Sequence, residues 1–320
     1  MAEFSIKKQI INLPFIPLLQ AARPVHWIKN LSIFAALIFT GTLFIPYYVK
    51  TVVLAFIAFG LATSSTYVFN DIIDIKSDRL HPIKKSRPIA SGRLSIPLAL
   101  VETAVLAITA LWLAHAQNEL FFIAVLGYLI LQILYSLVLK NLAVVDILVI
   151  ASGFILRIYA GAFVINAHLS VWFLLCVISV ALFLASGKRR AELNSIQNTG
   201  QLTRKSLSRY PRELLNSYVT MFGNAAWMSW SLFTFFESPK ASLPVWLFLA
   251  EISKATTVNK LMMFTIPIAI FGIMRYERLI FDERSEAPEK LLLTDFPLVA
   301  SVSIWVVLVV WILYGGVSII

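Results

Sequence analysis

The 320-residue sequence has few of the side chains on which soluble enzymes most often rely, with one cysteine, four histidines and 14% charged residues. A soluble domain has about 25% charged residues. The single cysteine, Cys176, excludes an intramolecular disulfide, and the cysteine and histidines show no zinc-site spacing. The sequence contains neither a Walker phosphate loop nor a Ser/His/Asp signature. These absences leave the few charged side chains as the candidates for function.

Apolar residues make up 59% of the chain, and the mean hydropathy is +0.82. The apolar residues occur in runs of about 20, the length that crosses a bilayer core of ~30 Å as a helix. The sequence therefore predicts an all-α, polytopic membrane protein with about nine transmembrane helices. The predicted spans are residues 31–49, 51–70, 95–115, 119–138, 143–165, 170–187, 214–236, 260–276 and 296–317. Segment 244–251 is too short to cross and is predicted to lie at the membrane interface.

The distribution of positive charge predicts the orientation of these spans. With the N-terminus inside, 22 of the 27 Lys and Arg lie in cytosolic segments and 4 lie on the outer side. This bias follows the positive-inside rule. It predicts a multi-pass protein of the inner (plasma) membrane with an amphipathic cytosolic segment at residues 1–30. It also explains the net charge of +10 without a nucleic-acid partner. The dense charge, and hence the expected site, is cytosolic.

Three aspartates, Asp71, Asp74 and Asp78, follow the second predicted span at spacing i, i+3, i+7. On a helix this spacing places all three on one face. Carboxylates so close together repel each other unless a cation compensates, and Mg²⁺ takes such oxygen ligands together with substrate phosphates. Asn70 adds an amide oxygen. The alternative is a solvated loop whose aspartates pair with neighbouring Lys and Arg.

Basic side chains follow the aspartates directly, at Arg79, Lys84 and Arg87. A metal and cationic side chains can share the charge of a bound anion, so this arrangement suits Mg²⁺ with a diphosphate. His81 lies in the same stretch and is a candidate for lining the site. The stretch predicts an electrostatic role for Asp71 and Asp74, with no residue assigned as acid or base.

The run NDIIDIKSD (residues 70–78), followed by RPIASG (residues 87–92), resembles the first aspartate-rich motif of the UbiA superfamily of intramembrane prenyltransferases. The resemblance extends from about Arg23 to the last span. It implies one UbiA-type transmembrane domain over residues 1–320, with Mg²⁺ as the cofactor. It also implies that the cytosolic segments 70–93 and 188–213 form the active-site loops.

Further motifs resemble the decaprenyl-phosphate phosphoribosyltransferase branch of the superfamily. They are RPVHWIKN (23–30), DRLHPIKKSRPIASG (78–92), YSLVLKNLAVVD (135–146), SGFILRIYAG (152–161) and GKRRAEL (187–193). Ordinary members carry a second aspartate-rich motif where this sequence has GKRRAEL. The resemblance implies transfer of 5-phosphoribosyl from phosphoribosyl diphosphate (PRPP) to polyprenyl (decaprenyl) phosphate, in the synthesis of cell-wall arabinan precursors. The basic GKRRAEL cluster could hold a phosphate without a metal.

Arg157 lies inside a predicted span, where a charged side chain is expensive and marks a functional candidate. Its alternative is pairing with a buried acid such as Glu102. For Lys29, Lys140 and GKRRAEL the alternative is anchoring at the cytosolic interface. The predicted substrate-binding residues are Lys29, Asn30, Arg79, His81, Lys84, Arg87, Tyr135, Lys140, Asp146, Arg157, Lys188, Arg189 and Glu192.

Two other functions stay open at this point. A prenyltransferase of the ordinary UbiA type would use a prenyl diphosphate and an aromatic or lipid acceptor, and the missing second aspartate cluster argues against it. A transporter would place ionisable groups near the bilayer midplane, often in inverted repeats. Here the acids lie at cytosolic span ends. The expected partners are PRPP, polyprenyl phosphate and membrane lipids, and oligomerisation is left open.

Overall fold

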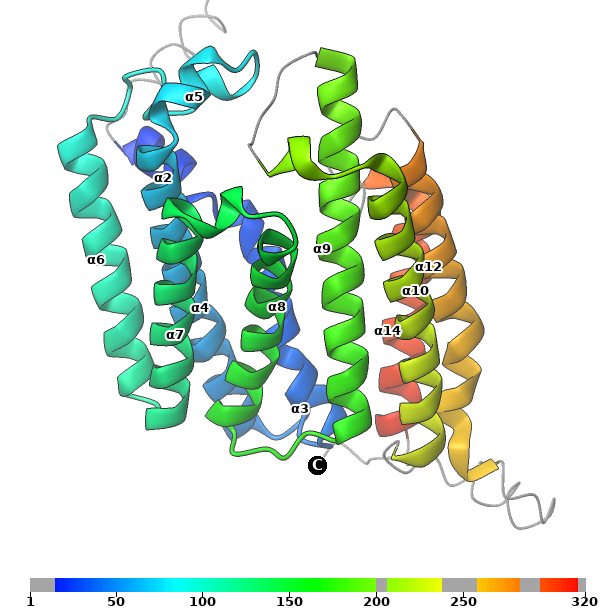
Figure 1. Cartoon of the computed structure of the whole chain (residues 1–320). Helices are drawn as coiled ribbons and strands as arrows, with labels where there is room; N and C mark the ends of the chain where they lie inside the picture. Colours follow the sequence, from blue (N-terminus) through cyan, green and yellow to red (C-terminus); the bar gives the residue numbers. More distant parts are fainter. Residues whose placement is uncertain (1–14, 200–205, 238–257, 283–293, 316–320) are drawn as a thin grey trace, which may run out of the picture. The chain divides into compact units, whose positions relative to one another are not determined.

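The computed structural model describes residues 15–199, 206–237, 258–282 and 294–315, which form helices, turns and loops (Figure 1). Residues 1–14, which are part of the predicted amphipathic segment, lie outside the described residues, as does segment 244–251. Residues 15–22 of that segment form helix α2 (Phe15–Ala22). The all-α prediction is confirmed for the described residues.

Six helices in the described ranges are long and apolar enough to cross a membrane. They are α4 (Pro46–Ile73), α6 (Ile96–His115), α7 (Glu119–Leu137), α8 (Val145–Val164), α9 (Val171–Thr199) and α14 (Phe296–Tyr314). Each coincides with a predicted span to within a few residues at most ends. The chief difference is in α9, which continues as a helix through residues 188–199, where a loop was predicted.

The other three predicted spans are not among these six, so the count of nine is not confirmed. The predicted span over residues 31–49 is not one continuous helix. The 3-10 helix η1 (Pro24–Phe34) and α3 (Ala35–Phe39) end at a turn, where Gly41 has φ +79°. A left-handed backbone of this kind favours glycine and ends a helix.

The remaining two predicted spans are not confirmed, for different reasons. Helix α10 (Arg212–Phe236) has 25 residues, but polar side chains such as Asn216 and Asn224 lie along it. The span over residues 260–276 is divided between the 3-10 helix η5 (Val258–Thr265) and α12 (Ile266–Phe281), which has only 16 residues.

The chain divides into two compact units, and the first consists of Met1–Phe34, Lys50–Lys140 and Leu156–Ile165. It contains α2, η1, α4, α6 and α7, the last two packed side by side (Figure 1). It also contains α5 (Ile75–Leu80), η2 (Lys84–Ser86), most of η3 (Leu139–Asn141) and residues 156–164 of α8. Ala21, Val68 and Ala99 belong to a buried core of this unit.

Small residues let α4 pack closely inside this unit. Residues 62–66 of α4 are Ala, Thr, Ser, Ser and Thr, and all are buried. Helices in membranes associate through small residues of this kind, because these let backbones approach and supply hydroxyl hydrogen bonds. The Ser64 hydroxyl donates to the Ala22 carbonyl at 2.7 Å, which fixes the end of α2 beside α4. Arg23, the next residue, is thereby held close to the acidic cluster.

The second unit consists of Ala35–Val49, Asn141–Ile155 and Asn166–Ile320. In it α9 packs along α10, and α12 packs against α14 and α10. The 3-10 helix η4 (Leu207–Arg209) precedes α10. One buried core lies where Ile147, Ala185 and Leu215 meet, and another joins Phe183, Val219 and Tyr276. The prediction of a single domain stays a prediction.

Candidate functional site

The acidic cluster lies where α4 passes into α5. The Asp74 N–H donates to the Asn70 carbonyl at 2.9 Å, and the Asp78 N–H donates to the Asp74 carbonyl at 2.8 Å. These i to i−4 bonds carry helical geometry across the junction, so the i, i+3, i+7 register is kept. The Asp71 and Asp78 side chains are buried, whereas that of Asp74 is partly exposed.

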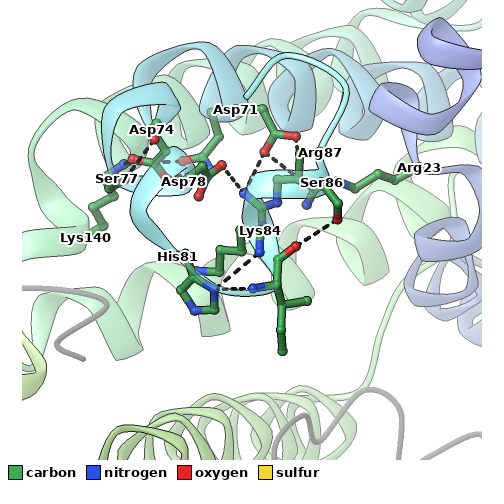
Figure 2. A network of polar contacts seen from close by, with 12 residues as sticks. Arg23, Asp71, Asp74, Ser77, Asp78, His81, Lys84, Ser86, Arg87 and Lys140 are labelled. Atoms are coloured by element: carbon green, nitrogen blue, oxygen red, sulfur yellow. Dashed lines mark hydrogen bonds and ion pairs between the residues drawn. The ribbon is translucent and has the colours of Figure 1, made fainter. Parts of the chain in front are cut away.

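Asp71 is held by two arginines (Figure 2). Arg23 Nη2 donates to both carboxylate oxygens of Asp71 at 2.6 Å, and Arg87 Nη1 donates to Oδ1 at 3.0 Å. The same Arg87 nitrogen donates to Asp78 Oδ2 at 2.6 Å. Arg87 therefore bridges the two buried carboxylates. This pairing is needed because an isolated carboxylate in such a place would be strongly destabilising.

Asp74 belongs to a second group of contacts. Lys140 Nζ lies 2.5 Å from Asp74 Oδ1 and 3.5 Å from Asn70 Oδ1. The Asn70 amide donates to Asp74 Oδ2 at 3.0 Å. Lys140 comes from the 3-10 turn η3 after α7, about 70 residues along the chain, and its side chain is 10% exposed. The structure therefore brings Asn70, Asp74 and Lys140 together, an arrangement that proximity in the sequence could not predict.

The three aspartates turn toward cations rather than toward a common point. Within the described ranges, no group of three or more His, Cys, Asp or Glu side chains converges as a metal-binding cluster does. The carboxylate and amide oxygens are nevertheless the ligand type that Mg²⁺ takes, usually with only one or two protein carboxylates. The donor set thus fits Mg²⁺ chemically. Binding of the metal requires the basic side chains that now pair with the carboxylates to move off them.

The loop after Asp78 is organised by two residues that were predicted to bind substrate. Arg79 Nε donates to the Ala90 carbonyl at 3.1 Å, closing residues 79–90. His81 Nδ1 accepts from the N–H groups of Ile83 at 3.2 Å and Lys84 at 3.3 Å. Burial, and then the nearby Lys84, hold the pKa of His81 below its usual value. Both side chains shape the loop that carries Lys84 and Arg87.

A buried polar group surrounds Arg157 in the same unit. Arg157 is 5% exposed, and its Nε donates to Asn30 Oδ1 at 2.7 Å. Its Nη2 donates to the Tyr128 hydroxyl at 3.1 Å, and the guanidinium lies over the Tyr128 and Phe59 rings. The alternative pairing with Glu102 finds no support, because Glu102 Oε2 accepts no hydrogen bond in the described part of the chain. Asn30 Nδ2 is likewise buried without an acceptor.

Two further predicted residues lie at the edges of this unit. Lys29 Nζ lies 3.5 Å from the Tyr67 hydroxyl on α4. Tyr135 lies near the end of α7, half-buried.

The second unit holds its own buried charged cluster, and each of its members has a partner. Arg189 Nε lies 2.7 Å from Asp146 Oδ2, and both side chains are fully buried. Arg189 also pairs with Glu192 on the next turn of α9. Lys188 precedes this pair on α9 and is half-buried. The three predicted residues Asp146, Arg189 and Glu192 are therefore brought together.

Two residues that the sequence did not indicate complete this cluster. The Tyr210 hydroxyl donates to Asp146 Oδ1 at 2.6 Å and accepts from the Val144 N–H. The Ser206 hydroxyl donates to Asp146 Oδ2 at 3.2 Å. Burial, followed by the hydrogen bond to Asp146, raises the pKa of Tyr210 above its usual value, so the phenol stays a donor. Neither residue belongs to a motif, so no sequence signal could have found them.

Arg190, the other arginine of GKRRAEL, has a structural role. Its Nε donates to Asn216 Oδ1 at 2.6 Å, and its Nη1 bonds to Asn194. Asn194 in turn donates to the Ile280 and Asp282 carbonyls, which satisfies the end of α12. Arg189 and Arg190 are neighbours in one motif but have different contacts. The sequence alone could not predict this difference.

Comparison with known proteins assigns this chain to a family. Residues 30–197 match the model of the UbiA prenyltransferase family, which is more than half of the chain.

The chain belongs to the UbiA prenyltransferase family.

The UbiA resemblance is supported by curated relatives. The chain is 37% identical over 222 residues to a decaprenyl-phosphate phosphoribosyltransferase of Mycolicibacterium smegmatis, covering 68% of this chain and 70% of that protein. It is 36% identical over 222 residues to the protein of the same name from Corynebacterium glutamicum, covering 68% and 67%. The relationship also makes the chain a multi-pass membrane protein.

The UbiA fold is supported by a solved structure. A UbiA homologue from Archaeoglobus fulgidus, bound to GPP and Mg²⁺, matches with a TM-score of 0.66 and 19% identity, over 93% of this chain and 99% of that one. At this identity the likeness concerns the fold alone. Both charged clusters have residues inside the UbiA match, since Asp71–Asp78 and Asp146–Glu192 lie within residues 30–197.

Proposed function

We propose that this UbiA protein transfers 5-phosphoribosyl from PRPP to polyprenyl (decaprenyl) phosphate and releases diphosphate. The observation that carries the proposal is the 37% identity to a curated decaprenyl-phosphate phosphoribosyltransferase. The site chemistry supports it, because one unit presents an acidic group with cations and the other carries Arg189 in place of a second aspartate cluster.

The donor would be held at the acidic cluster. Asp71, Asp74 and Asp78, with Asn70, would hold Mg²⁺. When bound, Mg²⁺ supplies charge neutralisation for the leaving diphosphate. Lys84, Arg87 and Lys140 would bind the diphosphate oxygens, because guanidinium and ammonium groups form strong charge-assisted hydrogen bonds with phosphates. Arg79 and His81 would act indirectly, by shaping the loop that carries Lys84 and Arg87.

In the reaction, the bond between the anomeric carbon and the diphosphate oxygen breaks, and its electron pair leaves with the diphosphate. An oxygen of polyprenyl phosphate forms the new bond at the same carbon, with inversion if attack is in line. This oxygen is already anionic near pH 7, since the second pKa of a phosphate monoester is about 6. No general base is required, and catalysis would rest on positioning and charge stabilisation.

The remaining phosphates would be bound by basic residues outside the acidic cluster. Lys188, Arg189 and Glu192, with Asp146 orienting Arg189, would serve one of the non-metal phosphates. Lys29, Asn30, Tyr135 and Arg157 would serve the acceptor side. The presence of Arg157 and an unsatisfied Asn30 Nδ2 in one buried group supports a polar ligand there. The isoprenoid chain would lie among the membrane lipids.

A label-transfer assay tests the proposal. Purified protein is incubated with Mg²⁺, ribose-labelled PRPP and polyprenyl phosphate, and the label is expected in the lipid phase. A parallel mixture offers a prenyl diphosphate and 4-hydroxybenzoate. Transfer only in the second mixture would contradict the proposal and support an ordinary UbiA prenyltransferase.

Variants of the acidic cluster test the metal assignment. Asp71→Asn and Asp74→Asn are expected to lower transfer by about 100-fold or more, because removal of transition-state charge stabilisation has effects of that size. Chelation of divalent metal should do the same in the unmodified protein. Full activity in both variants would remove the metal assignment.

A further inference from the structure

The acidic cluster contains as many cations as carboxylates. Arg23 and Arg87 contact Asp71, Arg87 also contacts Asp78, and Lys140 contacts Asp74 (Figure 2). Three carboxylates and three cations give a group that is close to neutral. A divalent cation entering alone would make this group strongly positive. A divalent cation entering with a diphosphate would not, because the anion compensates both the metal and the side-chain cations.

The arginines shield the carboxylates from solvent. The Asp71 and Asp78 side chains are 1% and 4% exposed, whereas those of Arg23 and Arg87 are 20% and 24% exposed. In each of these pairs the arginine side chain is thus the more exposed partner. A cation that approaches Asp71 or Asp78 from solvent therefore meets an arginine first and is repelled by its charge.

Arg23 is placed for this contact by the backbone. It follows α2 with φ 51°, in the left-handed region that a side-chain-bearing residue seldom adopts. One nitrogen, Nη2, contacts both Asp71 oxygens, and the guanidinium carbon lies 5.2 Å from the Tyr67 ring centre. A metal that binds Asp71 would need the same oxygens. Arg23 and the metal are therefore competitors for one carboxylate.

We propose that Arg23 and Arg87 are exchange partners that couple metal binding to diphosphate binding. The metal takes over the Asp71 and Asp78 oxygens, and the released guanidiniums bind the diphosphate that arrives with it. Guanidinium forks suit phosphate oxygens as well as they suit carboxylates, so each charge keeps a partner before and after the exchange. This inference rests on the proposed metal site and adds Arg23, which neither the sequence nor the proposed mechanism assigned.

The exchange predicts reciprocal cooperativity. Diphosphate should strengthen metal binding, and metal should strengthen diphosphate binding by the same factor, because linkage between two ligands is symmetric. Removing the Arg23 charge should then have opposite effects on the two ligands. The free metal should bind more tightly, since its competitor is gone, and the diphosphate should bind more weakly, since one of its partners is gone.

Mn²⁺ binding to the purified full-length protein tests the exchange without measuring activity. Bound Mn²⁺ is quantified by electron paramagnetic resonance, alone and with inorganic pyrophosphate, against protein-free blanks. In the unmodified protein, pyrophosphate should strengthen Mn²⁺ binding about tenfold. In Arg23→Gln, Mn²⁺ alone should bind about fivefold more tightly, and pyrophosphate should add little. Equal affinities in Arg23→Gln and the unmodified protein would overturn the proposal.

Three variants control this measurement. Arg93→Gln removes an exposed arginine whose contacts are Gln20, Ser86 and Ser91, so both affinities should stay as in the unmodified protein. Arg23→Lys keeps the charge, so the affinity for Mn²⁺ in the absence of pyrophosphate should stay as in the unmodified protein. If Arg23→Gln does not fold, Arg87→Gln takes its place with the same two predictions, and unchanged affinities in it would overturn the exchange equally.

Parallel transfer assays separate this inference from the proposed function. Phosphoribosyl transfer in the unmodified protein, together with Arg23→Gln affinities equal to those of the unmodified protein, would overturn the exchange and leave the function standing. No transfer, together with no Mn²⁺ binding that depends on Asp71, would overturn the function and the exchange with it.

Discussion

At the scale of single residues, the two charged clusters compensate their buried carboxylates in the same way. Asp71, Asp78 and Asp146 are all buried, and each has an arginine partner. Removing one partner of a buried pair leaves an uncompensated charge, which is far more damaging than losing an exposed pair. Substitution of a residue that pairs with one of these buried aspartates should therefore lower stability or binding more than substitution of an exposed charged residue.

The Tyr210 hydroxyl is one such partner. Tyr210→Phe removes the donor to Asp146 and the acceptor of the Val144 N–H, so we expect the free energy of unfolding to fall by about 2 kcal/mol. Denaturant titration in detergent measures this change. Tyr218→Phe is the matched control, since Tyr218 contributes its ring to the same core and keeps that contact. Equal stabilities of the two variants would contradict the role of the Tyr210 hydroxyl.

His81 predicts a pH effect with a definite sign. Its pKa is lowered in the folded protein, so the unfolded chain binds more protons and stability rises with pH. The His81 contribution should be complete above the ordinary pKa of about 6.5 and should be lost as pH falls below it toward the lowered value. The reason is that Nδ1 accepts two N–H groups only when it is unprotonated.

Thermal melting between pH 5 and 8 checks this effect. The stability difference between the unmodified protein and His81→Asn should shrink as pH falls below the ordinary histidine range. His168→Asn, at an exposed histidine, should leave the pH profile unchanged. Parallel profiles for the unmodified protein and His81→Asn would show that His81 does not stabilise the loop as a neutral acceptor.

At the scale of helices, much could be predicted from the sequence and some could not. Apolar runs and the i, i+3, i+7 aspartates depend on neighbours along the chain, so six spans and the acidic face follow from local rules. The contact of Lys140 with Asp74 joins residues 66 positions apart, and that of Tyr210 with Asp146 joins residues 64 apart. No local pattern encodes such contacts. Arg23 is the first residue of the motif RPVHWIKN, but the motif does not indicate that Arg23 pairs with Asp71.

Close approach between backbones gives a prediction at this scale. A Cβ at Gly161 would lie 2.0 Å from the Ile33 carbonyl oxygen, a backbone atom that cannot move aside cheaply. Gly161→Ala should therefore lower the free energy of unfolding by about 3 kcal/mol, in the upper range for overpacking. Gly127→Ala on α7 meets nothing within 4 Å and should be neutral or slightly stabilising. Equal denaturation midpoints for the two variants would contradict the close approach.

At the scale of the whole molecule, the charge bias predicts that the site lies on the cytosolic side, and the single cysteine makes this prediction testable. In a Cys176→Ser background, Lys85→Cys beside the acidic cluster and Lys50→Cys near the start of α4 introduce one exposed thiol each. We expect an impermeant maleimide to label Lys50→Cys from outside intact cells and Lys85→Cys only in inverted vesicles. The reverse pattern would place the acidic cluster on the outer face.

The central claim is that this UbiA protein uses a phosphoribosyl donor, and a donor competition tests it most directly. Purified protein receives equimolar PRPP and a prenyl diphosphate, with polyprenyl phosphate, 4-hydroxybenzoate and Mg²⁺, and mass spectrometry identifies the products. We predict phosphoribosyl-polyprenyl phosphate as the product that depends on Asp71, with no prenylated benzoate above the Asp71→Asn background. Asp71-dependent prenylated benzoate without the phosphoribosyl lipid would contradict the account.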